Sequence, residues 1–168
     1  MDKIFKAYDV RGTYPDQLNE ETAWRIGHAT AQFFRSQLTG YARSDPKHNV
    51  LAVGRDMRKS SPSLQKAFIE GALSAGVNVI DVGLIDTSQI YFAVNFLQTA
   101  GAVQTTASHN PGHYNGFKIT GAGGKPIGQD TGLQEIKRIA LAVPPRSSVP
   151  QADLTQRDLA KEYKAFVR

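Results

Sequence analysis

The chain has 168 residues, of which 40% are hydrophobic and 21% charged, and it carries a formal net charge of +5 and no cysteine. This length supports one real core and is too short for two comfortable domains. The lack of cysteine excludes disulfides and thiolate metal sites, and it fits a cytoplasmic location. No apolar run approaches a membrane span and the first residues have no signal-peptide pattern, so we expect no membrane contact.

The basic balance favours anionic partners such as phosphates, nucleic acids or acidic surfaces. Lysine and arginine are nevertheless scattered along the chain rather than gathered in blocks. The sequence has no basic helix, aromatic stacking platform or known nucleic-acid motif. We therefore expect no nucleic-acid partner.

Short runs of apolar and β-branched residues predict strands along the chain. The expected extended segments are residues 4–10, 50–53, 77–82, 101–103 and 117–120. The first is expected to break at Arg11-Gly12. The pair Asn115-Gly116 is a strong turn signal just before the last segment.

Amphipathic stripes with helical spacing alternate with these strands. The expected helices lie within residues 19–40, 61–76, 86–97, 133–140 and 159–166. Asn19 is a candidate N-cap, and so is either Asp86 or Thr87. Ser61-Pro62 combines a cap with a first-turn proline. Residues 41–49 and 143–152 are interpreted as linkers because they are polar or rich in Pro and Ser.

Strand–helix alternation of this kind predicts an α/β fold: a layered, mixed, largely parallel β-sheet with helices on both faces. In such sheets ligands bind beyond the carboxyl ends of the strands. The loops at Arg11, at Arg55–Arg58 and at Ser108 all follow predicted strands. We expect these loops to line one rim if their strands run the same way.

The loop Thr106–Pro111 holds a hydroxyl, an imidazole and an amide within a few positions. Its Asn110 precedes a proline, so the backbone there is pushed towards extended geometry and the loop should be held. Beyond the predicted turn, apolar residues alternate with Lys118 and Thr120. We expect Lys118 to face the same opening as the Ser108 hydroxyl.

Three interpretations of Ser108 compete on spacing alone. A hydrolase nucleophile is disfavoured, because no Gly-x-Ser-x-Gly elbow is present and the adjacent His109 would point away in an extended loop. A phosphate carrier would find suitable partners in Lys118 and Arg11, since phosphoryl transfer depends chiefly on positioning and charge. A well-hydrogen-bonded structural turn accounts for the residues equally well. A histidine metal site is not expected, because no carboxylates join His109 and His113.

The longer motifs carry a resemblance that spacing alone does not. Thr106–Pro111 followed by Tyr114–Lys118 closely resembles the active-site serine loop of the α-D-phosphohexomutases, which include phosphoglucomutase and phosphomannomutase. Tyr8–Gly12 resembles their amino-terminal phosphate-contacting motif. Gly54–Arg58 followed by Ser60–Pro62 is similar to their next loop. The resemblance covers most of the chain and implies the fold of domain I of that superfamily.

The resemblance implies that Ser108 is phosphorylated and exchanges its phosphoryl group with a hexose 1- or 6-phosphate through a 1,6-bisphosphate. Mg²⁺ would bind an oxygen of the phosphoserine, and glucose or mannose 1,6-bisphosphate would act as activator. Arg11, His109 and Lys118 would be catalytic. The same three residues and Asn110 would contact phosphate.

Family members have four domains, and residues 1–145 resemble domain I alone. Residues 146–168 would then be a linker and the start of a helix leading into an absent domain II. The metal-binding Asp-Gly-Asp-x-Asp segment and the sugar-selecting loop are not found. We therefore expect the isolated chain to be inactive, with domains II–IV of the same polypeptide and a phosphorylated hexose as partners.

One alternative function remains open. The alternative function is a stand-alone, non-catalytic module that binds phosphate or a protein partner. Arg11, Arg55, Arg58 and Lys118 are expected to form one wall of an anion-binding cleft whose acidic metal site lies on an absent domain. Gln104 departs from the family pattern, which has an apolar residue at this point.

Overall fold

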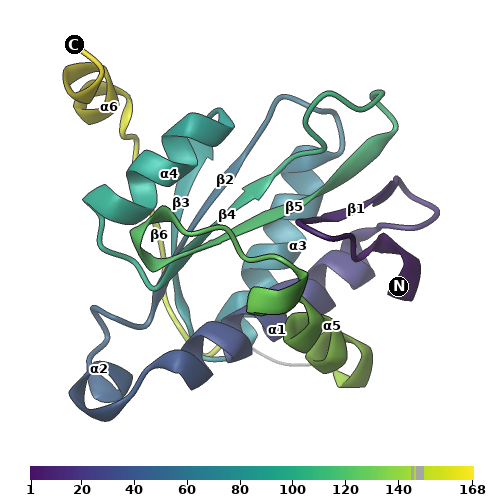
Figure 1. Ribbon diagram of the computed structural model, residues 1–168, viewed down its shortest axis with the longest axis horizontal. Coiled ribbons are helices and arrows are strands. Elements are labelled where there is room, and N and C mark those ends of the chain that lie inside the picture. Colours follow the sequence, from purple (N-terminus) through teal and green to yellow (C-terminus); the bar gives the residue numbers. More distant parts are fainter. Residues whose placement is uncertain (145, 147–149) are drawn as a thin grey trace.

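The structure is a computed structural model, which describes residues 1–144, 146 and 150–168. A six-stranded sheet forms the centre of the molecule (Figure 1). The strands are β1 (Val10–Thr13), β2 (Val50–Arg55), β3 (Asn78–Leu84), β4 (Gly101–Thr105), β5 (Tyr114–Gly121) and β6 (Leu154–Gln156). They lie in the order β1-β5-β4-β2-β3-β6. The pairs β4/β2, β2/β3 and β3/β6 are parallel, whereas β5 is antiparallel to both β1 and β4. This confirms the predicted mixed, largely parallel sheet.

Helices alternate with these strands along the chain, largely where the stripes predict them. They are α1 (Glu20–Gln37), α2 (Gly40–Ser44), α3 (Ser61–Ser74), α4 (Thr87–Phe96), α5 (Leu133–Ala142) and α6 (Ala160–Phe166). Two predicted caps are confirmed. Asn19 accepts a hydrogen bond from the Thr22 N–H at 3.0 Å, and Asp86 accepts one from the Gln89 N–H at 2.9 Å.

The helices cover both faces of the sheet, as expected (Figure 1). Apolar side chains of α1, α3 and α5 pack together on one face, and those of α4 pack on the other. Phe68 of α3 and Phe117 of β5 are fully buried, with ring centroids 4.9 Å apart. Burying two aromatic rings stabilises this interface between a helix and the sheet strongly.

Two glycines let α1 and α3 approach each other closely. A methyl group on Gly27 would lie 2.0 Å from the Phe68 carbonyl oxygen, and one on Gly71 would lie 2.0 Å from that of Trp24. Both distances are far below van der Waals contact. The absence of a side chain at these two positions therefore sets the spacing of the helices.

The predicted extended segment at residues 4–10 is wrong in its position. Asp2–Ile4 form a short 3-10 helix, and the strand β1 includes Arg11 and Gly12 rather than breaking there. The turn lies earlier, where the Lys6 N–H donates to the Asp9 carbonyl at 2.8 Å. Pairing with β5 supplies the hydrogen bonds of β1, which a local pattern cannot reveal.

The predicted turn at Asn115-Gly116 is also wrong, because both residues lie inside β5. The Asn115 amide is buried and donates to the hydroxyls of Ser60 and Ser61 at 2.8 and 2.9 Å. A methyl group on Gly116 would lie 1.9 Å from the Val10 carbonyl oxygen. A buried polar anchor and a close strand approach therefore explain this dipeptide.

Ser61 and the predicted linkers need smaller corrections. Ser61 is the first residue of α3 rather than its cap, and its hydroxyl donates to Asp56 at 2.5 Å. The 41–49 linker contains part of α2. Residues 145 and 147–149 of the 143–152 linker lie outside the described part of the chain.

The strand β6 was not expected from the sequence. Its residues are exposed, so no hydrophobic alternation marks it. It nevertheless pairs in parallel with β3, and Leu159 beyond it is buried among the apolar side chains of the α4 face. The sheet therefore continues past residue 145, where we placed the end of domain I. That boundary stays a prediction.

Candidate active site

The loop that carries Ser108 leaves the sheet at the carboxyl end of β4 and returns as β5. β1, β2 and β4 run in the same direction, because β1 and β4 are both antiparallel to β5 and β4 is parallel to β2. Their carboxyl ends therefore meet at one edge of the sheet, which is where ligands bind in open α/β folds. The strand directions that the shared rim requires are thus present.

Ser108 sits in a strained, well-anchored turn. Its φ of 54° lies in the left-handed region, which costs a non-glycine residue about 1–2 kcal/mol. The Ser108 N–H donates to the Thr106 hydroxyl at 3.0 Å. Both the backbone N–H and the side-chain amide of Asn110 donate to the Ala107 carbonyl, at 3.1 and 2.8 Å. The amide of Asn110 is thus used within the loop.

Arg58, from the loop after β2, is bound to the backbone of the serine loop. Its guanidinium donates to the carbonyls of Ser108, Asn110, Pro111 and Tyr114 at 2.8, 2.7, 2.8 and 3.1 Å. Hydrogen bonds from charged donors contribute about 1.5–3 kcal/mol each, so two of them offset the strain at Ser108. Arg58 was expected to contribute charge to an anion-binding wall, but its N–H donors are taken by protein groups in this geometry.

Asp56 joins the two loops a second time. Its carboxylate accepts from the Arg58 Nε–H at 3.2 Å and from the Thr106 hydroxyl at 2.8 Å. Thr106 in turn accepts from the Ser108 N–H. Ser108 is therefore held through its carbonyl by Arg58 and through its amide by Thr106 and Asp56. Sequence reasoning missed this network, although an Asp and an Arg two residues apart beside a strand end are a usable signal.

His109 does not point away from Ser108 as predicted. Its Nδ1 lies 3.3 Å from the Ser108 Oγ, because the left-handed backbone at Ser108 turns the two side chains together. Both residues are exposed. In the described part of the chain no third group makes a hydrogen bond to the His109 ring, so an oriented nucleophile–base–acid triad is not formed.

Lys118 lies on the sheet face that leads to the serine loop. It stands opposite Gln104 in the antiparallel register of β4 and β5, and opposite residues share a face. Arg11 stands opposite Gly116, two residues before Lys118, so it lies on the same face. The Lys118 ammonium makes no hydrogen bond or ion pair with the described residues, whereas Arg11 is paired with Asp9.

The structure explains the polar side chain at Gln104. It is fully buried, and its amide donates to the Ile85 carbonyl at 2.7 Å, which ties β4 to the loop after β3. Its neighbour across the sheet is Gly54, where a methyl group would lie 2.7 Å from the Gln104 Oε1. Gly54 thus makes room for a polar side chain in a row that ends at Lys118.

A cleft of about 460 Å³ opens beside these residues. It is lined by residues from the end of β4, from the loops after β2 and β4 and from the start of α4, namely Asp56, Met57, Arg58, Asp86, Thr87, Gln104, Thr106, Ser108, Asn110 and Gly112. The Ser88 hydroxyl holds the pKa of Asp86 below its ordinary value, so this carboxyl stays ionised as the cap of α4. Lys118 and Arg11 are not among the residues that line the cleft.

Comparison with known proteins decides the family. Residues 2–145 match the family described as phosphoglucomutase/phosphomannomutase, alpha/beta/alpha domain I. The chain belongs to this family. A phosphomannomutase of Klebsiella pneumoniae is 41% identical over 161 residues, which are 95% of each chain. A crystal structure of a phosphoglucomutase/phosphomannomutase family protein from Burkholderia thailandensis superposes with a TM-score of 0.80 at 34% identity, which confirms the domain I fold.

The chain spans about a third of the length of most relatives in this family. It covers 34% of the Burkholderia protein. It also covers 28% of a phosphomannomutase of Vibrio cholerae, to which it is 43% identical over 136 residues. The match to that protein takes in 81% of the present chain. The matched part of the family is thus domain I, which carries the serine loop.

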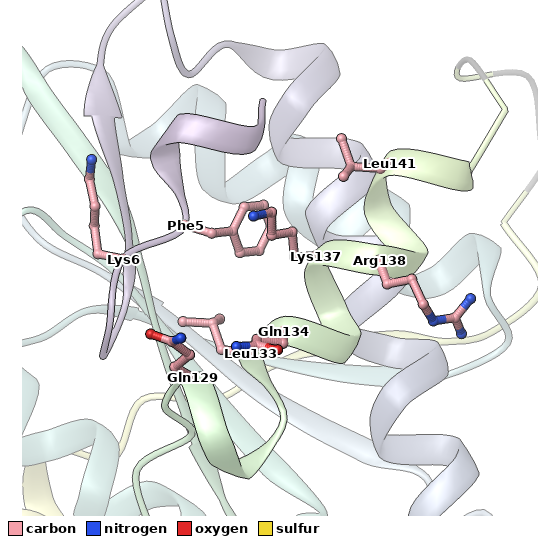
Figure 2. Close-up of a pocket in the computed structure, with 8 residues that line it drawn as sticks. All are labelled: Phe5, Lys6, Gln129, Leu133, Gln134, Lys137, Arg138 and Leu141. Carbon is pink, nitrogen blue, oxygen red and sulfur yellow. The ribbon is translucent and has the colours of Figure 1, made fainter.

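A second groove on this family member lies away from the serine loop, between the amino-terminal segment and α5 (Figure 2). It measures about 480 Å³. Figure 2 shows Lys6 and Arg138 turned away from its centre. Lys6 donates to the Lys3 carbonyl at 2.7 Å, Lys137 pairs with Asp2 at 2.5 Å, and Arg138 pairs with Glu135 at 2.6 Å. Because these cations already have partners, the groove is the weaker candidate for an anion.

The described residues contain neither a membrane-spanning helix nor a cluster of metal-ligating side chains. No helix among them is long and apolar enough to cross a membrane. No group of three or more His, Cys, Asp or Glu side chains in the same part of the chain is arranged to hold a metal ion.

Proposed function

We propose that this chain is the serine-carrying domain of a phosphohexomutase, which interconverts hexose 1- and 6-phosphates. Ser108 is the phosphoryl carrier. The Oγ–P bond of phosphoserine breaks as a sugar hydroxyl oxygen bonds to phosphorus, and the proton of that hydroxyl passes to the departing Ser108 Oγ, which gives the 1,6-bisphosphate and a free serine hydroxyl. The second half-reaction returns the other phosphate to Ser108. One observation carries the proposal: an exposed serine hydroxyl is held in a left-handed turn at the rim of a cleft at the sheet's carboxyl edge.

The basic side chains on the adjoining sheet face support this assignment. Lys118 has no partner among the described residues, so its ammonium is available to a phosphoryl group. Arg11 shares that face and would add a second charge, although Asp9 offsets part of it. His109 lies beside the Ser108 hydroxyl, where it would contact the phosphate, and Asn110 would act by shaping the loop. Catalysis of this kind rests on position and charge rather than on covalent chemistry by the protein.

The residues present fit a single metal ligand, an oxygen of the Ser108 phosphate. Both oxygens of nearby Asp56 are already hydrogen-bonded to Arg58, Thr106 or Ser61. Mg²⁺ would supply charge neutralisation at the phosphoserine, with carboxylates from the other domains that we propose for the full enzyme. Glucose or mannose 1,6-bisphosphate would serve as activator, and a cytoplasmic location fits this chemistry.

The experiment is a titration of the ¹⁵N-labelled chain with glucose 1,6-bisphosphate, followed by NMR. We expect the amide signals of residues 106–112 to shift and Lys118→Ala to weaken the apparent affinity about tenfold, because one charge-assisted contact is lost. Lys137→Ala, in the groove of Figure 2, is the matched control and should leave the affinity unchanged. Shifts confined to that groove would instead support the non-catalytic binding module.

The same samples test our proposal that the isolated domain lacks turnover. In a coupled assay that detects glucose 6-phosphate, glucose 1-phosphate and the bisphosphate should give no steady reaction. The Klebsiella relative that this chain matches almost end to end is called a phosphomannomutase. The expected lack of turnover therefore has to be measured on the 168-residue chain itself. Steady interconversion would contradict the need for further domains.

A further inference from the structure

The guanidinium of Arg58 has no donor left for a ligand. Arginine has five N–H donors. The Nε–H is taken by Asp56, the two Nη1 donors by the carbonyls of Pro111 and Tyr114, and the two Nη2 donors by those of Ser108 and Asn110. The side chain is only 12% exposed. A phosphate could bind Arg58 only by displacing part of the serine loop.

The four carbonyls bound by Arg58 belong to Ser108 and to three residues that follow it in the loop. They span the turn from Ser108 to Tyr114, the first residue of β5. One planar group therefore fixes the loop from Ser108 to its exit into β5. An ammonium group cannot replace it, because lysine has three donors on a single nitrogen and no planar fork.

A second path runs from Arg58 to the amide of Ser108. Asp56 is the partner of the Arg58 Nε–H and also accepts from the Thr106 hydroxyl, which accepts from the Ser108 N–H. Ser108 is thus hydrogen-bonded on both sides of its Cα, through its carbonyl to Arg58 and through its amide to Thr106. These hydrogen bonds hold its φ at 54°.

We infer that Arg58 is a positioning residue, which keeps Ser108 in the left-handed turn that presents its hydroxyl to the cleft, and that it is not a phosphate ligand. The inference rests on the proposed function for its effect on phosphoryl transfer, but its structural part stands without it. A misplacement of about 1 Å at a reacting group can cost about 100-fold in rate. Loss of Arg58 should therefore slow phosphorylation of Ser108 far more than it weakens binding of the bisphosphate.

The test compares Arg58→Lys and Arg58→Ala with wild type, using the 168-residue chain. NMR reports the Ser108 backbone conformation through the coupling between its amide and Cα protons, and the exchange rates of the amides of residues 106–110. Both variants should lose the left-handed signature and exchange faster, while the signals of β2 and α3 stay in place. Free guanidinium, well below denaturing concentrations, should restore the signature in Arg58→Ala, and ammonium should not.

Two controls separate the role from general effects of charge. Arg138→Lys makes the same chemical change on α5, and Lys59→Ala removes an exposed charge next to Arg58. Neither should alter the Ser108 signature. A left-handed Ser108 in Arg58→Lys would overturn the inference, and so would a large loss of bisphosphate affinity with the loop unchanged, since that is the behaviour of a phosphate ligand. If Arg58→Ala does not fold, Arg58→Lys decides.

Mass spectrometry of the chain after incubation with glucose 1,6-bisphosphate supplies the second readout. We expect the rate of phosphorylation to fall about 100-fold in Arg58→Lys, while the bisphosphate concentration for half-maximal rate changes less than about threefold. Equal rates in wild type and variant would contradict the positioning role. If wild type takes up no phosphate, the proposed function fails, and the NMR result still decides what Arg58 does.

Discussion

At the scale of single residues, the serine loop is held by polar side chains whose hydrogen-bond donors are already bonded to neighbouring protein groups. Arg58 donates to the loop carbonyls, and Asn110 folds its amide back onto Ala107. Lys118 is different, because its ammonium has no partner among the described residues. A residue that resembles a phosphate ligand by type therefore acts as one only if its donors are unoccupied.

His28 of α1 links one side chain to the pH dependence of stability. Desolvation lowers its pKa from the ordinary 6.5, and the ring also contacts the Ser74 hydroxyl at 2.7 Å. Below pH 6.5 the unfolded chain then binds more protons at this position than the folded chain, so acidification costs stability. The free energy of unfolding should fall as the pH drops from about 7 to about 5.

The variant His28→Gln isolates this contribution. Urea unfolding across the same pH range should show a smaller fall for the variant than for wild type, because the other three histidines are common to both chains. A difference in the free energy of unfolding that is the same at every pH is not the readout. Parallel curves would show that His28 does not titrate differently in the folded state.

At the scale of elements, the contact between α1 and α3 has little tolerance. Gly71→Ala would place a methyl group 2.0 Å from the Trp24 carbonyl oxygen, so the helices must move apart. We expect a loss of about 2 kcal/mol in the free energy of unfolding, even though alanine favours helix formation. Gly112→Ala is the control, since no atom lies within 4 Å of its added methyl group. Equal stability of the two variants would contradict the close-packing account.

The elements also show what sequence can and cannot predict. Sequence pattern located the buried strands and the helices, because β2 and β4 are short apolar runs buried on both faces and α5 buries a single stripe with helical spacing. It misplaced β1 and missed β6, whose hydrogen bonds come from partners distant in the chain. The residues of the serine loop were found from their motif. Their anchoring by Arg58 was not, because those bonds join residues 50 to 56 positions apart.

At the scale of the whole molecule, the mixed sheet brings the chemistry to one edge. The antiparallel strand β5 returns the chain beside β4, which puts Lys118 on the face that leads to Ser108. We propose that Ser108 at this edge carries the phosphoryl group. The two hydroxyls nearest to it in sequence, Thr105 and Thr106, are respectively buried and bonded to Asp56, so they are poorer acceptors.

Intact-mass spectrometry after incubation with glucose 1,6-bisphosphate and Mg²⁺ shows whether Ser108 accepts a phosphoryl group. Wild type should gain one phosphate that a phosphatase removes, and Ser108→Ala should gain none. Thr106→Val keeps the Ser108 hydroxyl but removes the threonine hydroxyl that accepts from the Ser108 N–H, so this variant should gain phosphate more slowly. An equal gain by Ser108→Ala, or no gain by wild type, would show that Ser108 is not the phosphoryl carrier.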